Sequence, residues 1–327
     1  MKIRYETPAI ILVIAMFVVA DITDQKEIVF PEIAALALGA WVMEKSPWPG
    51  ADLHYWLSPT LAALTGIIFM RFFSYAPFFM VLTAFCFVVL QLKLARSAVL
   101  PSISAAILPI ITRSDSWWYP LSVCVLTGVL ALGRVAFNRY DPAGASTAAN
   151  PSGRGNADAW SPREMLHWGK LLAGVALIAF VAIGFGFTFM LAPPLIVAFV
   201  ELSKPGGLLR DKAGKAFVLL GLAAISGVSW LYLIHTVLGL PVWVSTCLST
   251  PTVFLLYHAM RFPFPPAVAI ALLPTILPEE VLVMYPLQVI AGGAGFIALS
   301  KTLFGSDETP SRTREQMSEI QGASPES

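Results

Sequence analysis

The sequence predicts an all-α polytopic membrane protein with about twelve transmembrane segments in two homologous six-segment halves. Three observations predict it: the composition, the spacing of apolar stretches and an internal repeat. Of the 327 residues, 57% are hydrophobic and 13% charged, and the mean hydropathy is +0.74. Soluble domains average about 45–50% apolar and about 25% charged residues, so the composition excludes a water-soluble globule. The net charge of +1 argues against nucleic acid as a partner.

Twelve apolar stretches follow one another along the chain. They lie at 7–22, 29–43, 56–74, 76–92, 98–112, 117–137, 166–188, 190–203, 214–236, 239–260, 264–277 and 281–304. Several reach the roughly 20 residues that a helix needs to cross a hydrocarbon core of about 30 Å. Four are shorter and begin at a proline, namely Pro31, Pro101, Pro194 and Pro266. Because the bilayer core offers the backbone no water, these four are expected to be short helices, partly shielded by protein.

The basic residues favour a topology in which all twelve stretches cross. With the N-terminus inside, only Lys26, Arg71 and Arg113 of the 21 lysines and arginines then lie outside. If the four short stretches were re-entrant, ten would lie outside: Lys26, Lys45, Lys93, Arg96, Arg113, Lys204, Arg210, Lys212, Lys215 and Arg261. Short cytoplasmic loops carry the Lys/Arg excess, so twelve crossings are favoured. Both termini are expected in the cytoplasm, and the membrane is expected to be a plasma membrane of the bacterial inner-membrane type.

The chain is expected to have four parts. Residues 1–139 form the first six-segment repeat, and residues 166–305 form the second. Between them, residues 140–165 are rich in Ala, Ser, Gly, Asn and Pro, which predicts a flexible cytoplasmic linker. The linker ends in Ser161-Pro162-Arg163-Glu164, a typical helix start. The polar residues 306–327 are expected to form a disordered tail.

The duplication rests on a nearly constant offset between the halves. Three pairs lie 165 positions apart, namely Arg96 and Arg261, Pro101 and Pro266, and Pro109 and Pro274. Pro31 and Pro194 lie 163 positions apart. Since each half has an even number of crossings, we expect the halves to be related by a pseudo-two-fold axis along the membrane normal. A weaker similarity inside each half leaves open an arrangement of four three-helix units with neighbouring units inverted.

Two stretches of the second half carry a family resemblance. One is Phe264-Pro265-Pro266-Ala267-Val268-Ala269, and the other is Pro193-Pro194 followed by the loop Arg210-Asp211-Lys212-Ala213-Gly214-Lys215. Together they resemble the HPP family of integral membrane proteins, named for a His-Pro-Pro motif that begins a short membrane segment. The resemblance covers about 170–303, with a fainter copy at 8–137. Phe264 replaces the motif histidine and Asp211 replaces the loop asparagine. The resemblance implies a permease, with nitrite as the type of substrate.

The candidate substrate-pathway residues lie at or near the Pro-led stretches, because ionisable groups in a membrane are costly and often functional. They are Glu32, Pro31, Pro101, Ser102, Ser104, Pro194, Pro266, Arg96, Arg261 and His258. Each ionisable group also has a structural explanation. Glu32 fits a first-turn acid that the helix dipole favours, Arg96 and Arg261 fit interfacial snorkelling, and His258 fits a hydrogen-bonded interfacial residue. Tryptophans near segment ends, Trp48 among them, are typical of interfacial aromatic belts.

The sequence favours a permease or secondary transporter for a small solute, with a preference for a small anion such as nitrite. A non-transporting scaffold or subunit is the first alternative, and an efflux protein similar to aromatic-acid exporters is the second. The chain lacks HExxH, G-x-S-x-G and P-loop motifs, so neither an enzyme nor a cofactor or metal is expected. The expected partners are the lipid bilayer and the solute, and a homo-oligomer stays open. We expect the site at the half–half interface near mid-membrane, where the first-turn amide donors of the Pro-led helices would face the solute.

Overall fold

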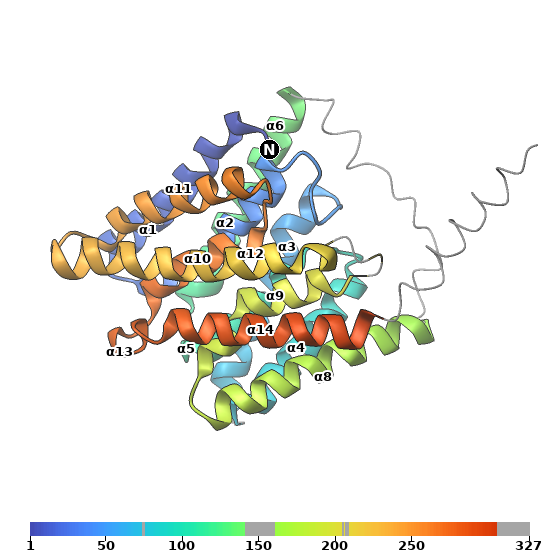
Figure 1. Ribbon diagram of the computed structural model, residues 1–327. Coiled ribbons are helices and arrows are strands. Elements are labelled where there is room, and N and C mark those ends of the chain that lie inside the picture. Colours follow the sequence, from blue (N-terminus) through green and yellow to red (C-terminus); the bar gives the residue numbers. More distant parts are fainter. Residues whose placement is uncertain (74–75, 141–160, 205, 207–208, 306–327) are drawn as a thin grey trace, which may run out of the picture.

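The computed structural model describes every residue except 74–75, 141–160, 205, 207–208 and 306–327 (Figure 1). In this described part of the chain, every regular element is a helix. Seven of the described helices are long and apolar enough to cross a membrane, and shorter apolar helices accompany them. The protein is therefore a polytopic helical membrane protein, as the composition predicts.

Each of the twelve predicted apolar stretches contains a helix. The first six are α1 (Glu6–Thr23), α2 (Glu32–Ala37), α3 (Asp52–Phe72), α4 (Pro77–Leu94), α5 (Pro101–Thr112) and α6 (Trp118–Tyr140). The other six are α8 (Pro162–Gly184), α9 (Pro193–Leu202), α10 (Ala213–Leu231), α11 (Val242–Met260), α12 (Pro265–Leu272) and α14 (Tyr285–Phe304). A π-helical turn, Leu38–Val42, continues α2, and another, Tyr232–Val237, continues α10. A 3-10 turn, Leu273–Ile276, follows α12, and the four-residue helix α13 (Glu279–Leu282) precedes α14.

The helix start predicted at the end of the linker is present. The Ser161 hydroxyl oxygen accepts a hydrogen bond of 3.1 Å from the backbone N–H of Glu164, and Pro162 is the first residue of α8. This cap satisfies one of the donors that a helix N-terminus leaves unpaired. Helix α8 therefore begins four residues before position 166, where the second apolar half was predicted to start. The rest of the predicted linker from 141 onward and the predicted tail at 306–327 lie outside the described residues.

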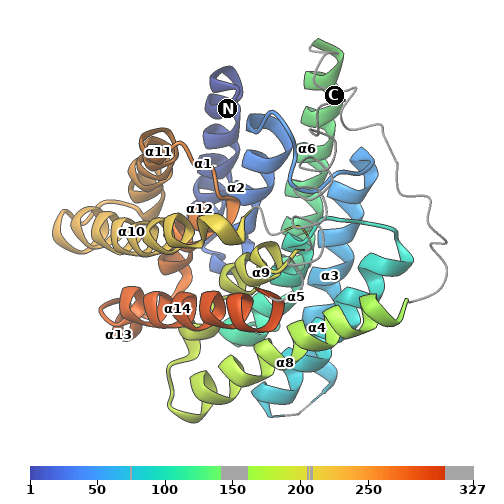
Figure 2. The same cartoon turned by 45° about the vertical axis from the view of Figure 1, so that its right-hand side comes forward.

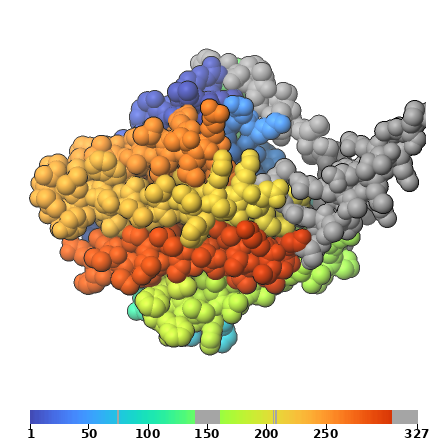
Figure 3. Space-filling model, in the orientation of Figure 1, coloured from blue at the N-terminus to red at the C-terminus, as the bar shows by residue number. Residues whose placement is uncertain are grey.

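The four Pro-led helices form the centre of the molecule. Every residue of α2, α9 and α12 is buried, and α5 is buried from Pro101 to Ile111. Both α9 and α12 begin one residue earlier than predicted, because each starts with two prolines and the first occupies the N1 position that suits proline. Long helices surround this centre, as Figure 2 shows for α3, α6, α10 and α14. In the space-filling view, α8, α10, α11 and α14 cover one face (Figure 3).

The outer faces of the long helices are apolar. Leu132 on α6, Phe180 on α8 and Leu255 on α11 each expose about 70% of their surface, at 72%, 67% and 69%. Exposed apolar surface on this scale is typical of a face that meets another apolar phase, since soluble proteins rarely carry large apolar patches. These faces fit contact with lipid, and the short helices they enclose are shielded from it.

Contacts between the first six helices and the last six come in matching pairs. Helix α1 contacts α11, and α4 contacts α8; helix α2 contacts α12, and α5 contacts α9. In the correspondence predicted from the sequence, α1 pairs with α8, α2 with α9, α4 with α11 and α5 with α12. The contact of α1 with α11 therefore corresponds to that of α8 with α4, and the contact of α2 with α12 corresponds to that of α9 with α5.

Side-chain details around α5 and α12 repeat as well. The hydroxyl of Tyr119 donates to the carbonyl oxygen of Ala105, and the hydroxyl of Tyr285 donates to that of Ile270, both at 2.8 Å. Two glycines on long helices also face carbonyl oxygens of these short helices. A Cβ at Gly66 would lie 2.3 Å from the oxygen of Ala106, and one at Gly227 would lie 2.1 Å from the oxygen of Ala271. In both places the close packing of a long helix on a short one requires glycine.

Candidate functional site

A small cavity lies where the first turns of the four short helices meet. Its walls are Glu32 and Ala35 from α2, Pro101 from α5, Pro194 and Val197 from α9, Pro266 and Ala269 from α12, and Trp48 from the segment between α2 and α3. The structure thus brings three of the predicted prolines together with the residue that follows the fourth, Pro31. The cavity volume is about 10 Å³. This is near the lower limit for one water molecule, about 10–15 Å³.

Glu32 is the ionisable side chain in this cavity wall. It is the first residue of α2 and is 1% exposed. Its Oε1 accepts a hydrogen bond from the hydroxyl of Ser104 on α5. Its Oε2 is buried and has no hydrogen-bond partner among the described residues. A buried carboxyl with one unused oxygen costs free energy, and such groups often serve a function that offsets this cost.

Ser102 and Ser104 differ in their surroundings although both are fully buried. Ser104 binds Glu32, whereas the Ser102 hydroxyl lacks a hydrogen-bond partner in the described part of the chain and is not in the cavity wall. The equivalent positions of the second half carry Ala267 and Ala269, and Ala269 does line the cavity. The polar side chains of the cavity therefore come from the first half.

The expectation that first-turn amide donors of the Pro-led helices face the solute is wrong for three of these donors, because each is paired with the preceding backbone. The N–H of Ile103 donates to the oxygen of Leu100 at 2.9 Å, that of Leu195 to Ala192 at 2.8 Å and that of Ala267 to Phe264 at 3.0 Å. Short i to i−3 bonds of this kind pair helix ends with the chain just before them. The next donor of α12, the N–H of Val268, is paired at 3.0 Å with the hydroxyl of Tyr257. Among the described side chains of the cavity wall, Glu32 has a buried oxygen, Oε2, without a hydrogen-bond partner.

Trp48 does not belong to an aromatic belt, contrary to the prediction. It is fully buried, its indole N–H donates to Oε1 of Glu201 on α9, and its ring lies against Gly39. A Cβ at Gly39 would lie 2.6 Å from the ring, so glycine makes room for the indole. Glu201 is itself 4% exposed and also forms an ion pair of 2.9 Å with Lys204. The hydrogen bond between Trp48 and Glu201 was not predicted from the sequence. The signal that could have indicated it is the acidic residue Glu201 inside the apolar stretch 190–203.

The three basic residues among the predicted ones lie away from the cavity. His258 on α11 makes a 2.8 Å contact with the carboxylate of Glu6 on α1, and Arg261 follows α11 at an exposed position. Arg96 lines a separate cavity of about 620 Å³, together with Lys93 and Lys204. Both arginines adopt positive φ, 51° and 49°, immediately after or near the end of a long helix. The two arginines share this left-handed backbone conformation, and neither lies in the wall of the cavity that contains Glu32.

Comparison of the chain with protein-family models, with curated proteins and with solved structures finds no match. The resemblance to the HPP family stays an expectation from the sequence. Within the described residues, no cluster of three or more His, Cys, Asp or Glu side chains is arranged to hold a metal ion.

Proposed function

We propose that all twelve apolar stretches cross the membrane and that both termini are cytoplasmic. Three contacts support this topology. Lys93 pairs with Glu164 at 2.7 Å, His258 contacts Glu6 at 2.8 Å, and Arg210 donates to the oxygen of Phe304 at 2.6 Å. In each contact, a re-entrant arrangement of the short stretches would put the two partners on opposite sides of the membrane. With twelve crossings, all six residues share the cytoplasmic side.

The halves are proposed to be duplicates related by a pseudo-two-fold axis along the membrane normal. The reciprocal contacts of α1 with α11 and of α4 with α8 support this, because a two-fold axis exchanges one contact for the other. The matching bonds of Tyr119 and Tyr285 support it in detail. The cavity then lies at the interface of the halves, near the proposed axis.

Within this architecture, the protein is proposed to be a secondary transporter or facilitator for a small solute. The observation that carries the proposal is the unused Oε2 of Glu32, buried at the meeting point of the four short helices. Intramembrane carboxyls commonly mark ion pathways and proton relays. A protonated Glu32 can donate a hydrogen bond to a solute through Oε2, and an ionised Glu32 can accept one.

The preferred solute class is a small anion such as nitrite. Helices α5, α9 and α12 point their N-termini, the positive ends of their dipoles, towards the cavity. An ionised Glu32 would repel an anion from this place, whereas a protonated one would not. Anion and proton are therefore proposed to enter together, with Glu32 holding the proton.

The structure fits an occluded state of such a cycle. The cavity is too small for a solute, and Trp48 closes it with an indole fixed by Glu201. The 620 Å³ cavity lies beside this closure, since Pro47 and Pro49 on either side of Trp48 line it. Movement of Trp48 is thus proposed to connect the two cavities on the cytoplasmic side.

Uptake of nitrite into proteoliposomes of the purified protein tests the proposal. Uptake should exceed that of protein-free liposomes and should rise when the exterior is acidic. Glu32→Gln should remove the dependence on the proton gradient, whereas Glu280→Gln, at an exposed acid, should keep it. No uptake of nitrite or of a panel of other small anions and neutral solutes would favour the alternative, a non-transporting scaffold.

A further inference from the structure

Two contacts between a basic and an acidic side chain join the first six helices to the last six. The ammonium of Lys93 on α4 lies 2.7 and 2.8 Å from the two carboxyl oxygens of Glu164 on α8. The Nε2 of His258 on α11 lies 2.8 Å from Oε1 of Glu6 on α1. Lys93 and His258 are 165 positions apart, the same offset that relates α5 to α12. Under the proposed duplication, the two contacts are therefore equivalent.

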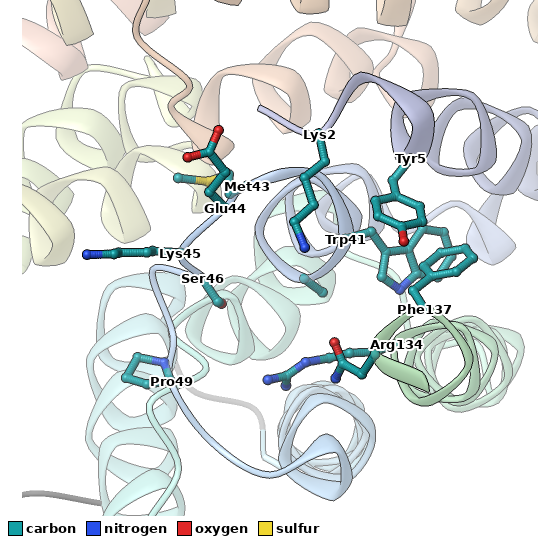
Figure 4. A pocket seen from close by; sticks show the side chains of 12 residues that line it. Lys2, Tyr5, Trp41, Met43, Glu44, Lys45, Ser46, Pro49, Arg134 and Phe137 are labelled. Carbon is teal, nitrogen blue, oxygen red and sulfur yellow. The ribbon is translucent and has the colours of Figure 1, made fainter. Parts of the chain in front are cut away.

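Each acidic partner is anchored to its own half. Glu6 is the first residue of α1, and the preceding Tyr5 packs on Phe137 of α6 with 4.5 Å between ring centres. Figure 4 shows this anchor, with the ring of Tyr5 beside that of Phe137. In the second half, the ammonium of Lys170 on α8 donates to the oxygen of Leu303 on α14 at 2.9 Å. Each contact between a basic and an acidic side chain therefore holds one half to the other.

The two contacts differ in their chemistry. Histidine is the side chain type whose ordinary change of charge falls between pH 5 and 8, whereas lysine ordinarily keeps its positive charge over this range. A protonated His258 forms a charge-assisted hydrogen bond with Glu6, and a neutral His258 forms a weaker bond without opposite charges. Of the two equivalent contacts, we therefore expect the one with histidine to depend on pH.

The surroundings of His258 leave Glu6 as the acid that it meets. The elements packed against α11 are α1, α10, α12 and the π-helical turn after α10. Their charged or titratable side chains are Glu6 and Asp21 on α1, Lys215 on α10, and Tyr232 and His235 on the turn. Glu6 and Lys215 lie at the end of α11 that carries His258, and the other three lie towards the opposite end. Arg4 just before α1 and Arg261 just after α11 add basic groups at this end.

We propose that the two contacts close equivalent interfaces between the halves at their cytoplasmic ends. A rise in pH loosens the interface of α1 with α11 and leaves the interface of α4 with α8 closed, so that the halves move about the second interface as a hinge. The equivalence rests on the proposed duplication, and the cytoplasmic placement rests on the proposed topology. The pH response rests on the contacts themselves and does not require transport.

Distances between nitroxide spin labels in the full-length protein in proteoliposomes test this proposal. One pair of labels replaces the exposed Ile3 and Leu255 beside the interface of α1 with α11, and the matched pair replaces the exposed Leu166 and Leu90 beside that of α4 with α8. Serine first replaces the three native cysteines, Cys86, Cys124 and Cys247.

The labels are compared at a pH of about 5.5 and of about 8, equal on both sides of the membrane. For Ile3 and Leu255, the ratio of longer to shorter distances should rise about two- to fivefold at the higher pH, as expected for the loss of one exposed ion pair. For Leu90 and Leu166, the distances should stay the same.

Variants at the two equivalent positions make the test specific. His258→Lys should keep the interface of α1 with α11 closed at both pH values, and His258→Gln should leave it loosened at both. Lys93→His should give the interface of α4 with α8 a pH response of its own. His235→Gln, at an exposed histidine towards the opposite end of α11, is the matched control and should keep the wild-type response.

The proposal is overturned if the distances between Ile3 and Leu255 do not change with pH, if both label pairs change alike, or if the change persists in His258→Gln. If His258→Gln does not fold, His258→Lys decides: a pH response that survives in this variant overturns the proposal, and its loss supports it. Neither result depends on a solute, so a failure of the transport proposal would leave this test unaffected.

Discussion

The hydroxyl of Ser104 donates a hydrogen bond to the carboxyl of Glu32 across 72 positions of sequence. The bond joins α5 to α2, two short helices that both begin at the central cavity. It satisfies one oxygen of the carboxyl, while the other has no hydrogen-bond partner among the described residues, and the side chain lines the cavity. Glu32 is thus held by one oxygen and kept available through the other.

Replacing Ser104 should destabilise the fold more than replacing Ser102. Ser104→Ala removes the partner of a buried carboxyl, which costs about 1–3 kcal/mol. Ser102→Ala removes a hydroxyl without a described partner and should change the free energy of unfolding by less than about 0.5 kcal/mol. Denaturant titration in micelles measures both. In Glu32→Ala, the further change Ser104→Ala should cost much less, and an equal cost in both backgrounds would contradict the assigned bond.

The variant with alanine at both serines is expected to fold and to transport less. Ala267 and Ala269 occupy the equivalent positions of the second half, so alanine fits this helix type. Loss of the Ser104 bond should disturb the orientation of Glu32 and slow nitrite uptake into proteoliposomes. Unchanged uptake by a correctly folded variant would remove both serines from the transport mechanism.

Gly39 should tolerate alanine when Trp48 is absent. In the wild-type background, Gly39→Ala places a methyl group 2.6 Å from the indole ring and should lower stability by about 1–3 kcal/mol. In Trp48→Ala, the same change should be neutral or stabilising. Gly169→Ala on α8 is the matched control, because a Cβ there meets no atom within 4 Å. Unfolding measurements on the four Gly39 and Trp48 combinations give the coupling, and additivity would show that the two residues do not touch.

Gly66 and Gly227 should respond alike to alanine. Each added methyl group would press on a backbone oxygen of a short helix, and backbone yields less easily than a side chain. We expect each variant to lose about 1–3 kcal/mol of stability. Gly214→Ala on α10, where a Cβ has open space, should not. A large loss at one of the two positions with none at the other would count against equivalent packing in the two halves.

Reporter fusions test the topology directly. Fusions at Ser152 and at the C-terminus should give cytoplasmic signals, and a fusion at Glu279 should report the outside. Glu279 lies in the exposed α13, beside Glu280 and without neighbouring basic residues. If Glu279 and the C-terminus both gave cytoplasmic signals, α14 could not be a single crossing between them, and the twelve-crossing topology would be abandoned.

The helices could be predicted from the sequence because membrane segments carry their own signals. Apolar length predicts the long helices, and proline predicts where the short ones begin. The meeting of Glu32 with Pro101, Pro194 and Pro266 agrees with the place expected from the repeat. An internal repeat indicates which distant segments occupy equivalent positions, so it can predict which helices meet, whereas the pattern of a single helix cannot.

Residues in connecting segments could not be placed in this way. Trp48 lies between α2 and α3. Its position depends on the space that Gly39 leaves for the indole ring and on a hydrogen bond to the carboxylate of Glu201, 153 residues later. Arg134 looks like an ordinary basic residue near a helix end, and its burial follows from Asp52 and Tyr55 in another helix. The paired first-turn donors were also missed, because proline patterns do not show how the preceding chain turns back.

Trp48 and Glu201 come from different halves, and neither has an equivalent at the corresponding position of the other half. The proposed duplication therefore repeats the helices but not the hydrogen bond between Trp48 and Glu201. A cut of the chain between residues 140 and 165 would leave Trp48 on one fragment and Glu201 on the other. Neither fragment alone would contain a complete central cavity or the Trp48–Glu201 hydrogen bond. Formation of this bond would therefore report directly on whether the two fragments had associated in the membrane.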